Sequence, residues 1–201
     1  EPFIPGSSLK GKMRSLLQIK HGVIKTLEKS MGGNVKHVAT DDKIDADLFG
    51  NATGKTTEEP NTQKPSRLIV RDCELAGALL NGKKISKAEL LEKTEMPYTE
   101  GKTEVVIDRI TSAAVPRQIE RVPAGALFNL NLIVNIWEQD KNEERLMKAL
   151  FESLKLLTDD YLGGSGSRGY GNIAIDITDV LEKTSDYYSN AEGKPKSIKD
   201  K

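Results

Sequence analysis

The sequence predicts an α+β fold in which helices cover one face of an antiparallel sheet. Three observations lead to this prediction. The elements follow in the order helix, strand, hairpin-like insertion, strand, helix, strand; residues 128–137 alternate apolar and polar side chains; and leucines recur at helical spacing over residues 146–157. One further strand before the first helix would give β-α-β-β-α-β, the ferredoxin-like arrangement. We expect that strand to be missing from this chain and to lie upstream of Glu1.

The first element is a helix that starts in PGSSLKGKMR, with Ser7 and Ser8 as candidate N-caps. Gly22 marks a break in its pattern. The apolar residues at helical spacing are Leu9, Met13, Leu16, Leu17, Ile24 and Leu27. Residues 31–66 are rich in Gly, Asn, Thr and Lys, and we expect a mobile surface insertion there, enclosing one short helix near residues 44–49.

The middle of the chain predicts three strands and two insertions. Residues 67–75 and 103–111 look like strands, whereas 76–97 indicate a loop with a short helix. Residues 107–125 indicate a protruding hairpin. The strand over 128–137 is the clearest, because alternate residues share an apolar face. These residues are Phe128, Leu130, Leu132, Val134 and Ile136.

The last elements are a helix and a closing strand. The helix over 141–162 carries Leu146, Leu150, Leu154 and Leu157, and Asp140 or Asn142 is its expected cap. Residues 172–180 alternate Ile173, Ile175 and Ile177 inward and are expected to close the sheet. We expect one domain over 1–183, with insertions at 31–66 and 76–125, and a flexible tail over 184–201 that frays.

Composition excludes several classes of protein. Lys+Arg and Asp+Glu both number 30, so the chain is not a uniformly basic nucleic-acid binder, although a local basic stripe is allowed. One cysteine, Cys73, permits no intrachain disulfide, and two histidines give no Cys/His zinc site. No apolar run approaches the roughly 20 residues of a membrane span. We expect a soluble, cytoplasmic protein.

Two glycine patterns resemble nucleotide-binding motifs, but one has the wrong order of elements around it and the other the wrong spacing. Gly164, Gly166 and Gly169 fit G-x-G-x-x-G, yet this loop follows a helix and opens a strand, the reverse of a dinucleotide site. GNATGKT, residues 50–56, has three residues between its glycines where a P-loop needs four. The chain is therefore neither a Rossmann enzyme nor a P-loop NTPase.

The loop over 163–171 suits a different anion. Its glycines allow a backbone to approach a ligand and direct N–H groups at it, while Arg168 can pair with phosphate and Tyr170 can stack on a base. The alternative is a tight connection between a helix and a strand.

Two other segments carry cations in similar settings. Gly6, Ser7 and Ser8 stand at a helix N-terminus, with Lys10 and Arg14 one turn apart; the alternative is a capped helix with a solvated basic face. The 107–125 segment intersperses arginines with apolar residues, and its prolines, Pro116 and Pro123, are expected to break regular structure. The alternative there is an exposed hairpin with scattered salt bridges. Two sites suited to binding phosphate favour a polyanionic ligand over a small one.

Five blocks, taken in order, resemble the third Csm protein family, the repeated backbone subunit of type III-A CRISPR interference complexes in the RAMP superfamily. The blocks are residues 4–17, 48–51, 67–72, 103–122 and 160–171. The resemblance implies an RRM-like core and an antiviral ribonucleoprotein in which copies stack along a CRISPR RNA. Its implied partners are that RNA, complementary target RNA, other copies, other Csm subunits and the large polymerase-like subunit, with no membrane.

The resemblance also assigns RNA-binding residues to three segments. In that family the first helix and the glycine-rich loop grip the guide backbone, and a thumb pushes through the guide–target duplex. The corresponding residues here are Ser7, Ser8, Lys10, Lys12 and Arg14; Gly164, Gly166, Arg168, Gly169 and Tyr170; and, in the thumb, Arg109, Arg117, Gln118 and Arg121.

Members of the family cut target RNA at regular intervals with Mg²⁺ or another divalent metal and an Asp shortly before the IPGSSLKG motif. That position is expected upstream of Glu1, so we assign no catalytic or metal-binding residue, and Asp108, Asp159 and Asp160 are interpreted as structural. The hypotheses are an endoribonuclease subunit, a non-catalytic RNA-binding scaffold of the same superfamily, and an unrelated RRM-like single-strand binder that works as a monomer.

Overall fold

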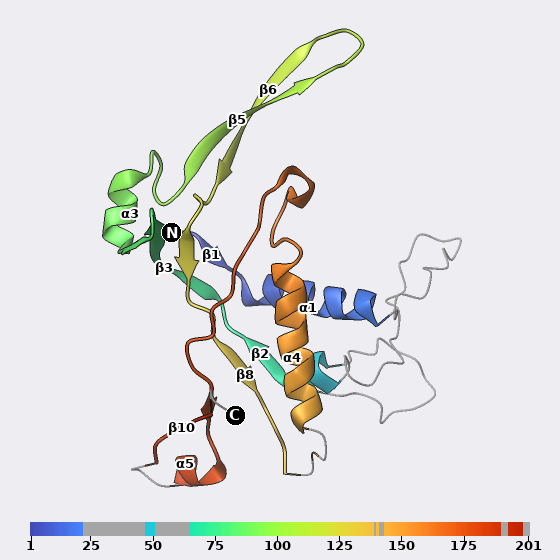
Figure 1. Cartoon of the computed structure of the whole chain (residues 1–201), viewed down its shortest axis with the longest axis vertical. Helices are drawn as coiled ribbons and strands as arrows, with labels where there is room; N and C mark the ends of the chain where they lie inside the picture. Colours follow the sequence, from blue (N-terminus) through green and yellow to red (C-terminus); the bar gives the residue numbers. More distant parts are fainter. Residues whose placement is uncertain (22–46, 51–64, 139, 141–142, 190–192, 199–201) are drawn as a thin grey trace, which may run out of the picture. The chain divides into compact units, whose positions relative to one another are not determined.

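The computed structural model describes residues 1–21, 47–50, 65–138, 140, 143–189 and 193–198. Most of the expected 31–66 insertion, as well as Gly22, Ile24, Leu27 and Asn142, lies outside these residues. The chain divides into two compact units, Glu1–Leu157 and Thr158–Lys201, each described by itself below. Figure 1 labels most of the helices and strands named in the text.

The first unit is built on the long strand β3 (Cys73–Leu80). It pairs antiparallel with β1 (Phe3–Ile4), β4 (Lys83–Ile85) and β7 (Ala126–Phe128). The short strand β1 precedes the first helix within this chain, and the further strand expected upstream of Glu1 stays a prediction. A strand of two residues between prolines is too short to show any alternation.

A separate antiparallel ladder joins β2 (Leu68–Val70) to β8 (Leu132–Val134), so the expected strands over 67–75 and 128–137 are each split in two. Between β2 and β3, Asp72 Oδ1 accepts a hydrogen bond from the Gly6 N–H at 2.8 Å, which ties this turn to the first helix. Leu130 and Ile136 of the expected apolar face are 36% and 43% exposed. Alternation predicted the side-chain faces only in part, and it did not predict the pairing.

The expected loop over 76–97 is wrong for its first ten residues, which continue β3 and form a hairpin with β4. Asn81 and Gly82 make its turn with φ of 52° and 77°, which is the left-handed pair that a two-residue hairpin turn requires. The expected short helix is present as α3 (Lys87–Lys93). Ser86 and Glu89 form a capping box at its start.

The helix α1 (Gly6–Lys20) packs against β2 and buries Leu9, Met13 and Leu17. Its N-cap is Pro5, so Ser7 and Ser8 lie in the first turn and are not the caps. The start of α1 lies close to β2, because a Cβ added to Gly6 would stand 2.2 Å from the Val70 carbonyl oxygen. This contact fixes where the helix begins.

The helix α4 (Glu143–Thr158) buries the four leucines that the sequence placed on one face. They are Leu146, Leu150, Leu154 and Leu157. Asp140, an expected cap, has its carboxylate bound to the Arg67 side chain and the Trp137 N–H. Elsewhere in the first unit, a buried hydrophobic cluster lies between β3, β4 and α3. It consists of Leu75, Ala78, Ile85 and Leu90. Residues 47–49 are helical, with Leu48 and Phe49 buried.

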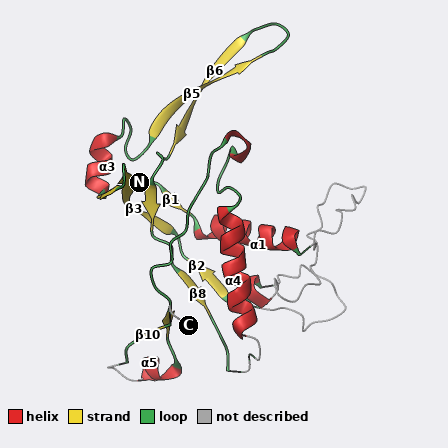
Figure 2. Cartoon of the chain, viewed as in Figure 1, coloured by secondary structure: helices red, strands yellow, loops and turns green. Residues whose placement is uncertain are grey.

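The expected protruding segment is a regular two-stranded hairpin of β5 (Glu100–Ile107) and β6 (Ala114–Arg121) (Figure 2). Pro116 does not break it and stands opposite Val105 within the ladder. A proline is tolerated because each strand of a two-stranded ladder has an open edge, where no N–H is needed.

The second unit contains a 3-10 turn η1 (Gly166–Arg168), the paired strands β9 (Leu181–Glu182) and β10 (Lys196–Ser197), and α5 (Ser185–Ser189). Residues 172–180, all of them described, form no strand, so the expected closure of the sheet is wrong. Ile173, Ile175 and Ile177 are nevertheless half-buried while their neighbours are exposed. The tail that was expected to fray holds α5 and β10. Within the described parts of both units, no helix has the length and apolarity needed to cross a membrane.

Candidate nucleic-acid interface

The outer face of α1 presents small and basic side chains near the helix start. Ser7 and Ser8 are exposed, and Lys12 and Arg14 are half-exposed. Lys10 is instead tied to the protein, because its Nζ donates to Ser66 Oγ at 2.5 Å and to the Leu68 carbonyl at 2.8 Å. Burial, with the nearby Arg14 charge, lowers the pKa of Lys10. The helix therefore offers phosphates Arg14 more readily than Lys10.

Gly11 lies among these cations, on the exposed side of α1. A Cβ added there would meet nothing within 4 Å. Glycine inside a helix costs about 1 kcal/mol relative to alanine. The packing of this chain does not explain that cost, whereas a ligand backbone lying against the helix would.

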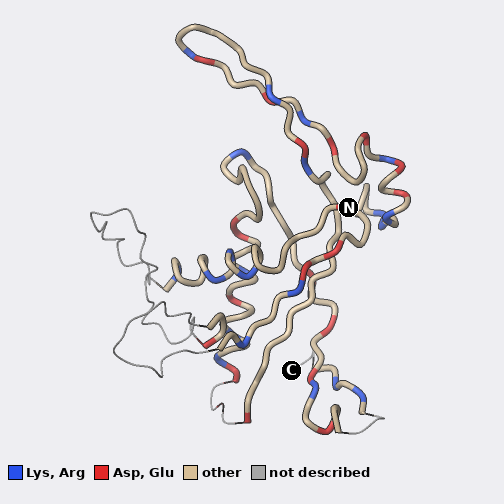
Figure 3. The backbone as a smooth tube through the Cα atoms, turned by 180° about the vertical axis from the view of Figure 1, so that it is seen from behind, with Lys and Arg blue, Asp and Glu red and all other residues tan. Residues whose placement is uncertain are grey.

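The thumb hairpin pairs its root arginines with glutamates directly across the ladder. Arg117 Nη2 donates to Glu104 Oε2 at 2.7 Å, and Arg121 Nε donates to Glu100 Oε1 at 2.5 Å. Figure 3 shows acidic and basic positions along both strands. Arg117 also keeps a buried Nε with no partner among the described residues. Gln118 is exposed beside it.

The tip of the hairpin is held by Asp108 and carries exposed apolar side chains. Asp108 Oδ1 accepts hydrogen bonds from the Ile110 and Thr111 N–H groups at 2.8 Å and 3.0 Å, and these bonds lower the pKa of its carboxyl group. Asp108 thus stabilises the turn at the tip of the hairpin. Ile110 is 94% exposed, and Arg109 beside it is exposed too. The other exposed apolar residues of the hairpin are Val105, Val106, Ile107 and Val115.

The glycine loop is a compact turn in the second unit. Ser165 and Gly169 flank η1 in left-handed conformation, with φ of 58° and 82°. The Gly169 N–H donates to the Gly166 carbonyl and the Leu162 N–H to the Gly171 carbonyl, both at 2.9 Å. Arg168 is exposed and Tyr170 half-buried.

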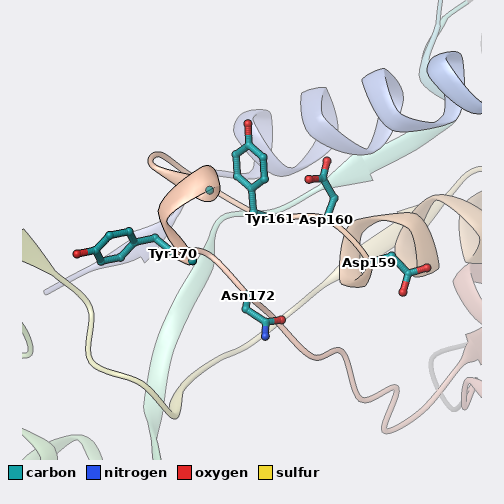
Figure 4. Close-up of a pocket in the computed structure, with 7 residues that line it drawn as sticks. Asp159, Asp160, Tyr161, Tyr170 and Asn172 are labelled. Atoms are coloured by element: carbon teal, nitrogen blue, oxygen red, sulfur yellow. The ribbon is translucent and has the colours of Figure 1, made fainter. Parts of the chain in front are cut away.

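The loop borders an open surface hollow of about 310 Å³, here called the pocket. Figure 4 shows its labelled side chains spreading from the loop in different directions. The pocket is lined by Asp159, Asp160, Tyr161, Gly166, Gly169, Tyr170 and Asn172. Of these, the sequence had singled out Gly166, Gly169 and Tyr170 for RNA. Tyr161 lies in the 160–171 block but was given no role there, and Asn172 follows that block.

A cluster of Arg67, Trp137 and Asp140 was not predicted from the sequence. The Arg67 guanidinium binds the Asp140 carboxylate through two nitrogens and lies over the Trp137 ring, 3.6 Å from its centroid. The hydrogen bonds from Arg67 and from the Trp137 N–H lower the pKa of Asp140 to about 2. These residues are separated by up to 73 positions, so only the β2–β8 ladder brings them together.

The candidate residues therefore fall on three elements: α1, the thumb hairpin, and the loop around η1. Among the described residues, no group of three or more His, Cys, Asp or Glu side chains could hold a metal ion. The divalent metal that the resemblance implies therefore has no such group of ligands among the described side chains.

Comparison with known proteins places the fold and these elements in a class. The sequence matches the RAMP superfamily over residues 1–174. A chain of a solved "Type IV-B CRISPR Complex" shares the fold with a TM-score of 0.52 at 17% identity, covering 95% of this chain and 82% of that one. The chain is thus a RAMP-superfamily protein.

Closer relatives specify the family. The chain is 38% identical over 197 residues to the CRISPR system Cms endoribonuclease Csm3 of Methanocaldococcus jannaschii, covering 96% of this chain and 71% of the relative. It is 43% identical over 176 residues to Csm3 of Streptococcus thermophilus, covering 87% and 69%. It is 37% identical over 193 residues to Csm3 of Enterococcus italicus, covering 94% and 78%. The chain belongs to the Csm3 family.

Proposed function

We propose that this protein is a CRISPR RNA-binding backbone subunit of a type III-A antiviral interference complex, and that it cleaves complementary target RNA at regular intervals in the cytoplasm. Membership of the Csm3 family, whose relatives are named endoribonucleases, supports the activity. The observation that carries the RNA-binding role is the thumb hairpin. It holds Ile110 and other apolar side chains in solvent on a rigid ladder of eight residue pairs.

The three elements support different parts of this function. The α1 face and the glycine loop provide hydroxyl, cationic and backbone N–H groups for phosphates of the guide. The thumb provides apolar side chains that can enter between bases, with Arg109 at its tip. Other copies of the chain would continue the same track along the guide, beside the other Csm subunits and the large polymerase-like subunit.

Cleavage requires groups beyond those described. We place the catalytic Asp upstream of Glu1, as the resemblance implies, together with Mg²⁺ or another divalent metal that would stabilise charge developing at the cleaved phosphate. Within this chain, the residues described bind and distort RNA. The second candidate, a non-catalytic scaffold, differs only at that upstream position.

The test is to purify the complex that contains this protein, sequence its RNA, and supply complementary target RNA with Mg²⁺. We expect guide RNAs with uniform repeat-derived 5′ tags and target fragments at even spacing. A second complex, in which only the upstream Asp is changed to Ala, should carry the same guides and cut nothing. Equal cleavage by both complexes would place the catalytic groups elsewhere, and no cleavage by either would favour the scaffold.

A further inference from the structure

Tyr161 lies just after α4, and the glycine loop fixes its ring from one side. A Cβ built on Gly166 would stand 2.2 Å from Cγ, 2.3 Å from Cδ1 and 2.4 Å from Cδ2 of Tyr161. Such similar distances to three ring atoms place the Gly166 backbone over a face of the ring. Any side chain at position 166 would collide with Tyr161, so Gly166 serves ring packing and not only ligand approach.

The pocket beside this ring has the wrong charge for a phosphate. Its seven lining residues include two carboxylates, Asp159 and Asp160, and neither lysine nor arginine. Tyr161 still exposes 38% of its surface, and Figure 4 shows its ring and the Asp160 carboxylate pointing to the same side of the loop. An aromatic ring beside a carboxylate suits a flat, uncharged group that carries N–H donors.

We propose that this pocket accepts a nucleobase of the RNA whose phosphates the glycine loop binds, which rests on the function proposed above. The base stacks on Tyr161, and Asp160 accepts a hydrogen bond from an exocyclic amino group. Adenine, cytosine and guanine have such a group and uracil does not. The phosphate of the same nucleotide lies toward Arg168, which is exposed on η1 and does not line the pocket.

The first experiment measures the affinity of the protein for oligoadenylate, oligouridylate and an abasic ribose-phosphate strand of equal length over a range of salt concentrations. The wild type should bind oligoadenylate most tightly. Tyr161→Leu should lower that affinity roughly ten-fold, in the range measured for the loss of one stacked base, and leave the salt slope unchanged. Tyr161→Phe, which keeps the ring, should behave as the wild type, and Asp160→Asn should narrow the preference for adenine over uracil.

The outcomes separate this inference from the function on which it rests. If the wild type shows no salt-dependent binding to any strand, the RNA-binding function itself fails. If it binds RNA with a normal salt slope but holds the abasic strand as tightly as oligoadenylate, the nucleobase pocket fails and the function stands. The second result needs no variant, so it decides the matter even if Tyr161→Leu disturbs the loop. A 2-aminopurine placed in oligoadenylate should lose fluorescence on binding the wild type and not on binding Tyr161→Leu.

Discussion

Gly171 and Gly164 belong to the same loop but meet different surroundings. Gly171 has a φ of 76°, and a Cβ there would stand 2.1 Å from the Leu162 carbonyl oxygen. Gly164 has no such φ, and a Cβ there would meet nothing within 4 Å. The fold requires a glycine at the first position and not at the second, which leaves ligand approach as the reason for Gly164.

Gly164→Ala should leave the melting temperature unchanged and weaken RNA binding, because its methyl group meets the RNA and not the protein. Gly171→Ala, the matched control in the same loop, should lower stability by at least about 1 kcal/mol, since a left-handed φ alone costs that much for an L-residue. Thermal unfolding and RNA titration of both variants check this. Unaltered RNA affinity for Gly164→Ala would show that nothing approaches that position.

Because of Asp140, the stability of the fold should depend on pH in the acid range. Its pKa is lowered to about 2 from a usual value of 3.8, mainly by the Arg67 hydrogen bond, so its carboxylate stabilises the fold above pH 3.8. That contribution should be lost as the pH falls from 3.8 to about 2. Asp140→Asn should therefore melt below the wild type at neutral pH, with a difference that shrinks over this window. Asp176→Asn, at an exposed position, is the control and should melt at the same temperature as the wild type at neutral pH.

At the scale of the element, α1 and the thumb were predicted from sequence for different reasons. The helix follows from the apolar spacing of Leu9, Met13 and Leu17, which are all buried. The thumb was expected from the arginines interspersed with apolar residues and from the prolines of residues 107–125. The ion pairs within it could have been found as well, because two glutamates four residues apart face two arginines four residues apart in a closed hairpin.

Other features could not be predicted because they depend on tertiary contacts. The 2.8 Å bond from Gly6 to Asp72 joins residues 66 positions apart and ties the turn between β2 and β3 to α1. The Arg67 cluster exists only because β2 and β8 pair. Asn81-Gly82 is different: its local signal was present in the sequence and was overlooked.

Gly11→Ala in α1 should raise the free energy of unfolding by about 1 kcal/mol, because alanine suits a helix interior better than glycine. The same change should weaken guide RNA binding if the RNA backbone lies on this face. Denaturant unfolding and RNA titration measure the two effects. Ser15→Ala, one turn further along the exposed side, is the control and should change binding less. A stabilised variant with full RNA affinity would identify the face as solvent-exposed only.

Arg117 in the thumb either contacts RNA or only stabilises the hairpin through its ion pair with Glu104. Two substitutions distinguish these roles. Arg117→Ala should weaken engagement of the target duplex more than loading of the guide. Glu104→Gln removes the cross-strand ion pair, which is worth up to about 1 kcal/mol, while keeping the cation. Duplex binding should then be largely retained. Equal losses from the two variants would assign Arg117 to the hairpin alone.

At the scale of the whole molecule, the two units differ in how much they bury. The buried side chains of the described residues all belong to Glu1–Leu157, and those of Thr158–Lys201 are half-buried or exposed. Local stability follows burial, so the second unit should open more often. The glycine loop therefore belongs to the part of the chain that a ligand can order most.

Hydrogen exchange should show this difference directly. Amides of residues 159–189 should exchange faster than those of β3 and α4, and guide RNA should slow exchange in the glycine loop more than in β3. Peptide-resolved exchange with and without RNA is the measurement. Uniform protection across both units, unchanged by RNA, would contradict this view of the loop.

The thumb hairpin also has a consequence for how the protein behaves without partners. Among the strands that the structure describes, β5 and β6 pair only with each other, so each keeps an open edge. The valines and isoleucines near the tip of the hairpin are exposed. Open edges with apolar side chains are where strands of separate molecules join into aggregates. The glutamate–arginine pairs and Pro116 interrupt such joining at the root and middle of the hairpin but not at its tip. An orphan subunit, released or synthesised in excess of its RNA, would therefore be prone to self-association through its thumb.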